Sequence, residues 1–330
     1  MRSARLSLAL DSGAIVLPPT GQITVFRPHE GDDLSALPKD RVTVVQGFRP
    51  DHDAFAAMGY RLAVQSQGQA TAALICLPRS RGEGRALVAE AAAHVVPGGL
   101  VIVDGQKTDG IDSMARDIRA RKEISLPLAK AHGRIFAFPA GPGFEGWAAH
   151  PVEVDGFTTM PGMFSADGPD RGSILLAQVL PAKLSARVVD LGAGWGYLSR
   201  AILARDGVKR LDLVEAEAAA LDCARINISD PRAHFHWADA LSFRPEGAVD
   251  TVVMNPPFHV ARAADPGLGV RFIAAAASML HQGGVLWMVA NRHLPYGSVL
   301  AEAFRDVEEV GGDGAFRLVR AARPLRARKS

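Results

Sequence analysis

The most specific chemical signal in the chain is a motif that follows an apolar run: Asn255, Pro256, Pro257 and Phe258. An amino group attached to a planar ring or a carbonyl is a poor nucleophile, because its lone pair is delocalised. Two acceptors that bind its hydrogens can turn it toward a tetrahedral shape and localise that lone pair. The side-chain carbonyl of Asn255 and the backbone carbonyl of Pro256 are suited to be these two acceptors. The motif therefore predicts a site that activates a conjugated amino nitrogen.

The other residues of the motif would hold these acceptors and the substrate in place. Proline fixes φ near −65°, so Pro256 and Pro257 would stiffen the turn before a substrate arrives. Phe258 offers a ring on which a planar base can stack. His259 follows, as either a substrate contact or an exposed loop histidine. A rigid loop without chemistry is the alternative for the motif by itself.

A glycine-rich turn lies upstream, in residues 187–203. The pattern is a short apolar strand, then Asp190, then Gly192, Gly194 and Gly196, then a helix. Glycine lets the backbone take positive φ and approach a ligand closely. A carboxylate directly before the glycines disfavours a pyrophosphate and suits a cationic or amino-acid-bearing ligand. A tight strand–helix turn without a ligand is the alternative.

Two more acids follow at predicted strand ends. Residues 208–217 predict a strand that ends in Glu215, about 20 residues after the glycines, where an acid can accept both hydroxyl hydrogens of a ribose. Residues 234–241 predict a third strand that ends at Asp239, which could bind an adenine amino group, and Ala240 belongs to the same predicted site. The alternatives are a surface acid for Glu215 and a helix N-cap for Asp239.

The elements that must position these residues alternate between strand and helix, and they occur twice. Residues 71–105 and 251–291 each contain an apolar strand, a proline, a loop, an Ala-rich amphipathic helix, a Gly-Gly turn and a second apolar strand. Upstream, residues 41–48 have roughly the same position in the first copy as residues 187–196 have in the second. This pattern predicts an α/β fold with mainly parallel sheets, built twice. Chance similarity is the alternative, and the matching flanks favour duplication.

The two predicted domains span residues 1–145 and 146–330. The boundary falls in residues 140–156, which are rich in glycine and proline and show no clear periodicity. The first copy lacks the glycine cluster, and it carries Leu77 and Pro78 where the second copy has its Asn-Pro motif. We interpret the first domain as a degenerate copy that kept the fold and lost the site.

Bulk properties exclude several classes of protein. A net charge of +2 does not mark a strong polyanion binder. Cys76 and Cys223 have no nearby Cys or His at metal-ligand spacing, so we expect core residues in a reducing compartment and no metal site. Apolar runs are too short for a membrane span or a signal peptide, which predicts a cytoplasmic protein without membrane attachment. The basic segment 317–330 is either a solvated end or a contact for a phosphate backbone.

The order of the features resembles that of class I methyltransferases that depend on S-adenosylmethionine (AdoMet). These features are a strand, an acid, a glycine cluster, two further acids and then Asn-Pro-Pro-Phe after a fourth strand. The last motif narrows the resemblance to enzymes that methylate a nitrogen conjugated to a ring or a carbonyl. The resemblance implies AdoMet as cofactor, a Rossmann-like sheet of the seven-stranded type in each domain, and in-line methyl transfer without a metal.

Residues 158–181 and 290–321, together with the Asn-Pro-Pro-Phe-His motif, resemble the ribosomal RNA small subunit methyltransferase C family. Members methylate the exocyclic N2 of a guanine in ribosomal RNA, and they consist of two tandem domains, the first degenerate. By this resemblance, Phe164 and Ser165 line the cofactor side of the site. Trp195 departs from the small residue common in the glycine turn, and we expect it at the rim of the pocket.

The resemblance also assigns one loop and helix start to the site, with the residues Asp170, Gly172 and Ser173. It implies guanine-N2 methylation of 16S rRNA in the small ribosomal subunit, by a monomer whose N-terminal half helps to hold the RNA. The alternatives are guanine-N2 methylation of 23S rRNA, adenine-N6 or glutamine-amide methylation, and a non-catalytic RNA-binding assembly factor. A dinucleotide oxidoreductase fits poorly, because its fingerprint needs a third glycine three residues after the second.

Overall fold

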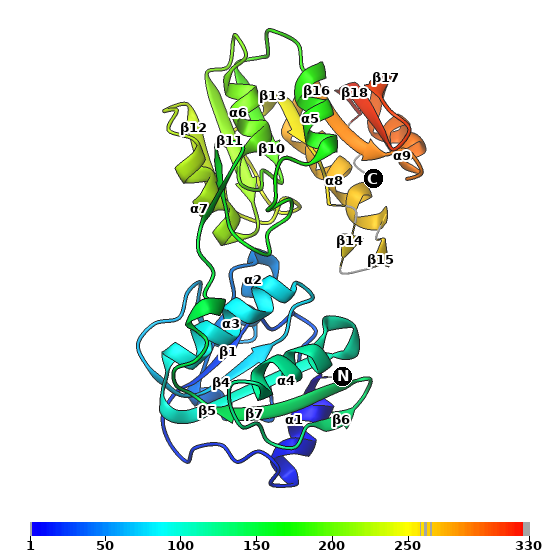
Figure 1. The fold of residues 1–330 in the computed structure, drawn as a ribbon. Helices are drawn as coiled ribbons and strands as arrows, with labels where there is room; N and C mark the ends of the chain where they lie inside the picture. Colours follow the sequence, from blue (N-terminus) through cyan, green and yellow to red (C-terminus); the bar gives the residue numbers. More distant parts are fainter. Residues whose placement is uncertain (1, 258, 261–262, 265, 326–330) are drawn as a thin grey trace. The chain divides into compact units, whose positions relative to one another are not determined.

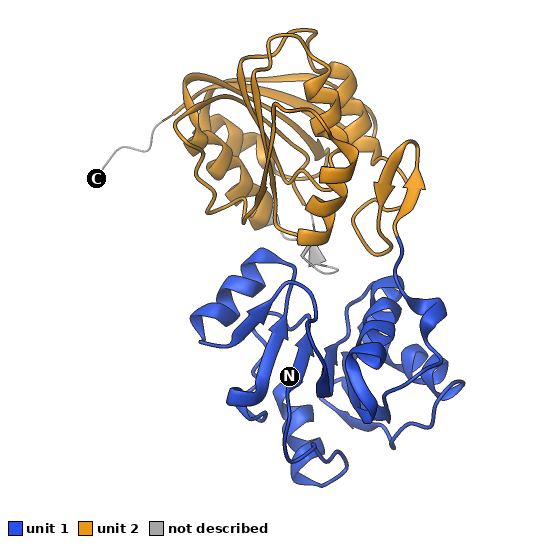
Figure 2. Cartoon of the chain, turned by 90° about the vertical axis from the view of Figure 1, so that its left-hand side faces the viewer, with its two compact units in different colours: residues 1–150 blue, residues 151–330 orange. Residues whose placement is uncertain are grey.

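Strand-forming runs of apolar residues build two seven-stranded sheets, one in each of the two units that the chain forms (Figure 1, Figure 2). Unit 1 contains residues 1–150 and unit 2 contains residues 151–330. The structure is a computed structural model, and it describes residues 2–257, 259–260, 263–264 and 266–325.

Unit 1 has a seven-stranded sheet with the order β3-β2-β1-β4-β5-β7-β6. Its strands are parallel, except that β7 runs antiparallel to both β5 and β6. The elements of unit 1 are α1 (Arg2–Asp11), β1 (Ile23–Phe26), η1 (Lys39–Arg41), β2 (Val42–Val45), α2 (Arg49–Ala57), β3 (Arg61–Ala63), β4 (Ala70–Cys76), α3 (Arg81–His94), β5 (Val95–Gln106), η2 (Lys107–Asp109), α4 (Ile111–Arg119), β6 (Leu128–Lys130), β7 (Gly133–Pro139) and η3 (Glu145–Trp147).

Unit 2 repeats this topology, because its main sheet has the order β12-β11-β10-β13-β16-β18-β17 and only β18 runs antiparallel to its neighbours. The elements of unit 2 are β8 (Val152–Val154), β9 (Phe157–Thr159), α5 (Arg171–Val179), β10 (Arg187–Leu191), α6 (Tyr197–Leu203), β11 (Arg210–Glu215), α7 (Ala218–Asn227), β12 (Ala233–Trp237), β13 (Val249–Met254), β14 (His259–Val260), β15 (Ala263–Ala264), α8 (Pro266–Met279), β16 (Leu280–Asn291), α9 (Tyr296–Ala303), β17 (Phe304–Gly312) and β18 (Phe316–Pro324). The predicted α/β fold with two mainly parallel, Rossmann-like sheets is confirmed.

One detail of the repeat differs from the expectation. The Gly-Gly pairs at 98–99 and 283–284 were expected in turns between a helix and a strand, but they lie inside β5 and β16. At these glycines the pairing of β5 with β4, and of β16 with β13, shifts register, at the same place in both units. Glycine tolerates such a bulge because it has no Cβ to be accommodated.

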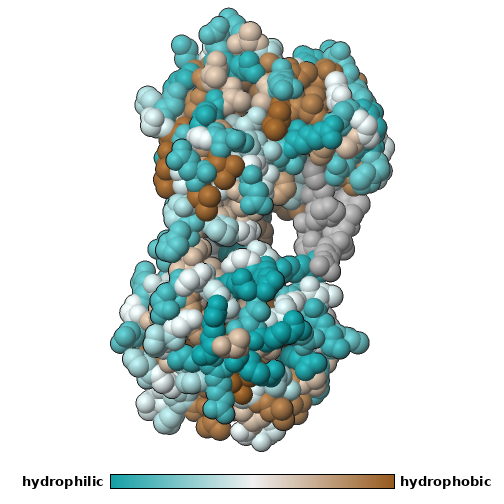
Figure 3. Space-filling view, viewed as in Figure 1, coloured by the Kyte–Doolittle hydropathy of each residue, from teal (hydrophilic) through white to brown (hydrophobic). Residues whose placement is uncertain are grey.

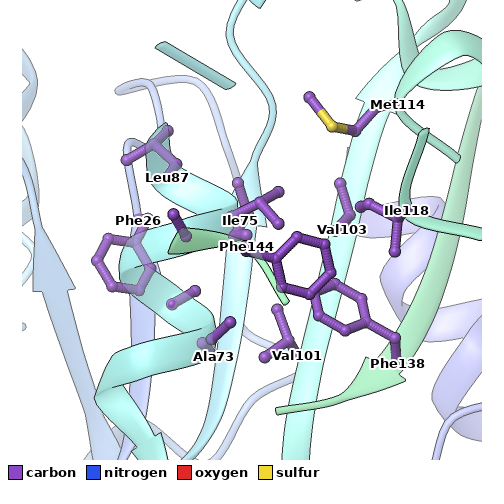
Figure 4. Close-up of a cluster of buried hydrophobic side chains, with 14 of the residues drawn as sticks. Phe26, Ala73, Ile75, Leu87, Val101, Val103, Met114, Ile118, Phe138 and Phe144 are labelled. Carbon is purple, nitrogen blue, oxygen red and sulfur yellow. The ribbon is translucent and has the colours of Figure 1, made fainter. Parts of the chain in front are cut away.

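Helices cover both faces of each sheet, so the strands bury side chains in both directions. Ile75 of β4 packs with residues of α3 and α4 (Figure 4), whereas its neighbour Leu74 packs with residues of α1 and α2. In unit 2, Val252 of β13 packs with α8 and α9, and Val253 packs with α5, α6 and α7. Burial on both faces explains why these strands are almost continuously apolar.

Hydrophilic side chains predominate on the visible face of unit 1 (Figure 3). Among the described residues, no helix is both long and apolar enough to span a membrane.

The basic segment that begins at Arg317 is not a solvated tail over the part that the structure describes. Arg317 and Arg320 belong to β18, and Arg323 forms an ion pair with Asp306.

Candidate active site

The predicted site residues of unit 2 meet at one edge of its sheet. Asp190 in β10 pairs in register with Leu213 of β11 and Val253 of β13. Because these strands are parallel, Glu215 at the end of β11 and Asn255 directly after β13 lie at the same carboxyl edge. From β10 the successive strands β11 and β12 lie on one side, whereas β13 and the later strands lie on the other side. Ligands of open α/β sheets bind at such a switch point between neighbouring strands.

The glycine turn combines positive φ angles with open space at one position. Gly192, Gly194 and Gly196 have φ angles of 81°, 56° and 96°. A Cβ placed on Gly194 would meet nothing within 4 Å, so this position leaves room for a ligand against the backbone. A Cβ on Gly196 would lie 2.9 Å from Ile228 Cδ1, so this glycine serves the packing of the turn on α7. Gly194 and Gly196 therefore have different roles.

Asp190 is fully buried beside this turn. Its Oδ2 accepts a hydrogen bond of 2.6 Å from the hydroxyl of Ser199, and no described group donates to its Oδ1. Burial raises the pKa of Asp190 from 3.8 to about 7, against the smaller opposing effect of Ser199. A buried carboxyl with an unpaired oxygen and a raised pKa marks Asp190 as a candidate functional group.

Glu215 is held by the backbone of its neighbours. Its Oε2 accepts the N–H of Gly194 at 2.8 Å, and its Oε1 accepts the N–H of Glu217 at 2.7 Å. Burial raises the pKa of Glu215, and these backbone bonds oppose the rise. Each carboxylate oxygen can accept a second hydrogen bond, so the group remains able to bind the two hydroxyls of a ribose.

Asp239 lies two residues beyond the end of β12, not at the strand end that the sequence predicted. Its Oδ1 accepts the N–H of Leu241 at 2.9 Å, and its backbone carbonyl accepts the N–H of Phe243 at 2.8 Å. It therefore closes a turn, and the helix that an N-cap would begin does not follow. Ala240 is buried beside it.

Asn255 has the most distinctive environment at this edge. Its Nδ2 donates to Asp170 Oδ2 and to Ser173 Oγ, both at 2.8 Å. Its Oδ1 is buried, and in the described part of the chain no group donates to it. The side-chain nitrogen of Asn255 thus donates two hydrogen bonds, whereas its side-chain oxygen has no donor among the described residues.

The rest of the motif is described in part. Pro256 is buried and Pro257 is exposed. Phe258 lies outside the described residues, as does Arg262, and nothing is described of the side chain of His259.

Trp195 ties the preceding loop to the glycine turn. Its indole N–H donates to the backbone carbonyl of Phe164 at 3.1 Å, which places Phe164 and Ser165 beside the turn. Contrary to the expectation of a rim position, Trp195 is buried, and its ring packs on Phe157 with centroids 4.9 Å apart. The side chain of Phe164 is 69% exposed, and Ser165 has a φ of 56°.

Two residues near the site escaped the sequence analysis. Ser199 binds Asp190, and its place in the first turn of the helix after the glycines would have been a usable signal. Asn227 bonds to the N–H and the carbonyl of Thr158 and to the carbonyl of Trp195. No local pattern marks Asn227, because its partners are far away in the sequence.

The corresponding edge of unit 1 is filled by its own side chains. Leu77, buried after β4, takes the place that Asn255 has after β13. Arg27 Nη1 donates to Gln46 Oε1 at 3.0 Å, and Gln46 Nε2 donates to the carbonyl of Pro28 at 2.7 Å. An apolar residue at the Asn255 position agrees with a copy that kept the fold without this acceptor.

Comparisons with known proteins agree with this geometry. Residues 155–320 match the family described as the methyltransferase small domain. The ribosomal RNA small subunit methyltransferase C of Salmonella paratyphi B is 31% identical over 71% of both chains. The protein of the same name from Shewanella amazonensis is 28% identical over 74% of this chain and 75% of its own length.

A solved structure extends the comparison to the whole fold. The T. thermophilus 16S rRNA N2 G1207 methyltransferase, in complex with AdoMet and guanosine, superposes with a TM-score of 0.80 over 98% of this chain and 91% of its own. At 23% sequence identity, this likeness shows a shared fold of two tandem units. Residues 155–320, within unit 2, thus carry the methyltransferase small domain, and the chain belongs to the ribosomal RNA small subunit methyltransferase C family.

Proposed function

We propose that this enzyme transfers the methyl group of AdoMet to the exocyclic N2 of a guanine in 16S rRNA. The observation that carries the proposal is the buried Oδ1 of Asn255, which lacks a donor among the described residues. Leaving a buried acceptor unpaired costs about 1–3 kcal/mol. A substrate amino group that donates to this oxygen would remove that cost, so the site favours a nitrogen that carries hydrogens.

The acceptors act on the substrate nitrogen. One hydrogen of the N2 amino group would bind Asn255 Oδ1, and the other would bind the backbone carbonyl of Pro256. Both contacts would favour a tetrahedral nitrogen, whose lone pair would form the new bond to the methyl carbon as the carbon–sulfur bond of the sulfonium breaks and the sulfur leaves as a neutral thioether. The methylated nitrogen is then cationic and loses one proton to solvent. The prolines hold both acceptors in place before the substrate binds, which lowers the entropic cost of the step.

Other residues at the same edge would hold the cofactor. AdoMet supplies a methyl group on a positively charged sulfonium. Asp190 would offer a negative charge to the cationic ligand, and Glu215 would bind the ribose hydroxyls. The open space at Gly194 leaves room beside the backbone. The segment with Asp239 and Ala240 would contact the adenine, and Phe164 and Ser165 would border the cofactor.

The names of the relatives support the choice of substrate. The curated relatives are named as methyltransferases of small-subunit ribosomal RNA, and the T. thermophilus enzyme is described as an N2 methyltransferase that holds guanosine. The tandem architecture argues against a glutamine-directed enzyme, which would carry a small helical N-terminal domain. We further propose a cytoplasmic monomer in which unit 1 helps to hold the RNA within the small subunit.

The test is methyl transfer from labelled AdoMet to ribosomal subunits that lack the modification. Small and large subunits are assayed separately, nucleosides from the product are identified by mass spectrometry, and Asn255→Ala is assayed in parallel. We expect N2-methylguanosine in small-subunit RNA, and a loss of about 100-fold or more in kcat for the variant.

Other outcomes would overturn parts of the proposal. Label in large-subunit RNA would keep the chemistry and change the substrate. Label on adenine would exclude the guanine assignment. Unchanged activity of Asn255→Ala would remove the role of the buried acceptor.

A further inference from the structure

The side chain of Asn255 is anchored by residues far away in the sequence. Asp170 lies 85 residues earlier and Ser173 lies 82 residues earlier, at the start of α5. Both accept hydrogen bonds from the same nitrogen, Asn255 Nδ2. Asp170 is itself fixed, because its Oδ2 also accepts the backbone N–H of Ser173 at 3.0 Å as the N-cap of α5.

This arrangement decides which end of the amide points away from α5. The oxygen and nitrogen ends of an asparagine side chain have nearly the same shape, so packing alone cannot choose between them. An ionised carboxylate only accepts hydrogen bonds. In the rotated amide, Asn255 Oδ1 would stand 2.8 Å from Asp170 Oδ2, two acceptors against each other. The nitrogen must therefore face Asp170, and the oxygen takes the unpaired position.

We propose that Asp170 and Ser173 are positioning residues for methyl transfer, which hold Asn255 with its oxygen toward the substrate nitrogen. This inference rests on the proposed function. The contact with a negative charge also polarises the amide and makes Asn255 Oδ1 a stronger acceptor. Removal of Asp170 would let the amide rotate and present N–H groups to an amino group that needs acceptors.

Gly172 keeps the anchor in its place. A Cβ at this position would lie 3.0 Å from Asp170 Oδ2 and 3.2 Å from both Phe316 and Val289. A larger residue would therefore press on the carboxylate or on the sheet behind it.

A helix cap by itself does not require a carboxylate. The N-cap of α3 in unit 1 is Ser80, whose side chain accepts the N–H of Glu83. The variant Asp170→Ser could keep such a cap for α5, while its short hydroxyl removes the charged partner of Asn255. Ser80→Ala is the matched control, because it removes a helix cap far from the site in sequence and in unit 1.

The decisive experiment exchanges the two groups. Asp170→Asn and Asn255→Asp are prepared alone and together, and kcat and KM for the RNA, the Kd for AdoMet and Tm are measured. Asn255→Asp alone sets two carboxylates against each other. In the double variant, the amide at position 170 can donate to the carboxylate at position 255, whose second oxygen still faces the substrate.

We expect each single change to lower kcat by about tenfold to 100-fold, with AdoMet affinity near that of the wild type. Asp170→Asn should keep Tm near that of the wild type, whereas Asn255→Asp should lower Tm because it sets two carboxylates against each other. The double variant should be about tenfold more active than the product of the two single losses predicts. Asp170→Ser should lose kcat while it keeps Tm, and Ser80→Ala should lower Tm while it keeps kcat.

Strictly multiplicative losses in the double variant, or full kcat in Asp170→Ser, would overturn the inference. The wild type, the two single variants and the double variant can be compared on any substrate whose nitrogen the wild type methylates. A wild type that methylates an amine other than guanine N2 would overturn the proposed function, and restored activity in the exchange would then still support the positioning role.

Discussion

Asp190 should make AdoMet binding depend on pH. The carboxyl group is fully buried, one oxygen has no donor among the described residues, and burial raises its pKa to about 7. A cationic ligand favours the ionised form, so AdoMet affinity should increase as pH rises toward neutrality. Asp190→Asn keeps the shape of the neutral side chain and should remove this dependence.

The size of the effect follows from the pKa. With a pKa of about 7, the ionised fraction of Asp190 rises from about 3% at pH 5.5 to about 50% at pH 7.0. AdoMet should therefore bind about 15-fold more tightly at pH 7.0 than at pH 5.5, if only the ionised form binds well. This range lies below the ordinary pKa of an α-amino group, ~7.7–8.0, so the cofactor itself changes little.

Stability without ligand should change in the opposite direction. The folded-state pKa of Asp190 is raised above its ordinary value of 3.8, so the folded protein keeps a proton that the unfolded chain releases. The free energy of unfolding should fall as pH rises from about 4 to about 7 and then level off. Asp190→Asn should lack this contribution.

Titration calorimetry at a series of pH values measures the first effect, and urea unfolding measures the second. All other titratable groups are common to the two proteins, so the difference between wild type and Asp190→Asn isolates Asp190. S-adenosylhomocysteine, which has no sulfonium charge, should show a weaker dependence. Equal slopes for the two proteins would refute the reasoning, because Asp190 would then be a structural group that stays protonated.

Three further predictions separate folding from function. Gly194→Ala should lower the free energy of unfolding by ~1–2 kcal/mol and weaken AdoMet binding. Gly196→Ala should lower the free energy of unfolding by more, because its Cβ would meet a side chain at 2.9 Å. Urea unfolding measures the stability of both variants, and calorimetry measures their AdoMet binding. Trp195→Phe removes the bond to the carbonyl of Phe164 and should raise the Kd for AdoMet severalfold, at a cost of ~1 kcal/mol in unfolding. Asp104→Ala leaves the buried Arg5 without its carboxylate and the buried Arg2 with Asp32 alone, and it should cost ~3–5 kcal/mol in unfolding. Calorimetry should show unchanged AdoMet binding by the protein that stays folded.

The sequence was most informative where a local pattern determines a local backbone. Glycines at 192, 194 and 196 predicted a turn with positive φ, and all three have it. Apolar runs that end in an acid or an amide placed Glu215 and Asn255 at strand ends. The prediction for Asp239 missed by two residues, because β12 stops before a turn whose hydrogen bonds are not visible in a hydrophobic pattern.

Tertiary packing explains the remaining differences. Arg317, Arg320 and Arg323 read as part of a basic tail, but they belong to β18, which lies between β16 and β17 and whose apolar residues are buried. Trp195 was expected at the rim of the pocket and is buried instead, since Phe157 from a segment 38 positions earlier covers it.

The sequence by itself determined the repeated α/β plan, the turn and the motif that carries the proposed chemistry. It did so because strand alternation, glycine and proline act on their immediate neighbours. Only the tertiary structure decided the orientation of the Asn255 amide and the raised pKa of Asp190. Both depend on groups that folding brings together, a carboxylate 85 residues away in one case and complete burial in the other.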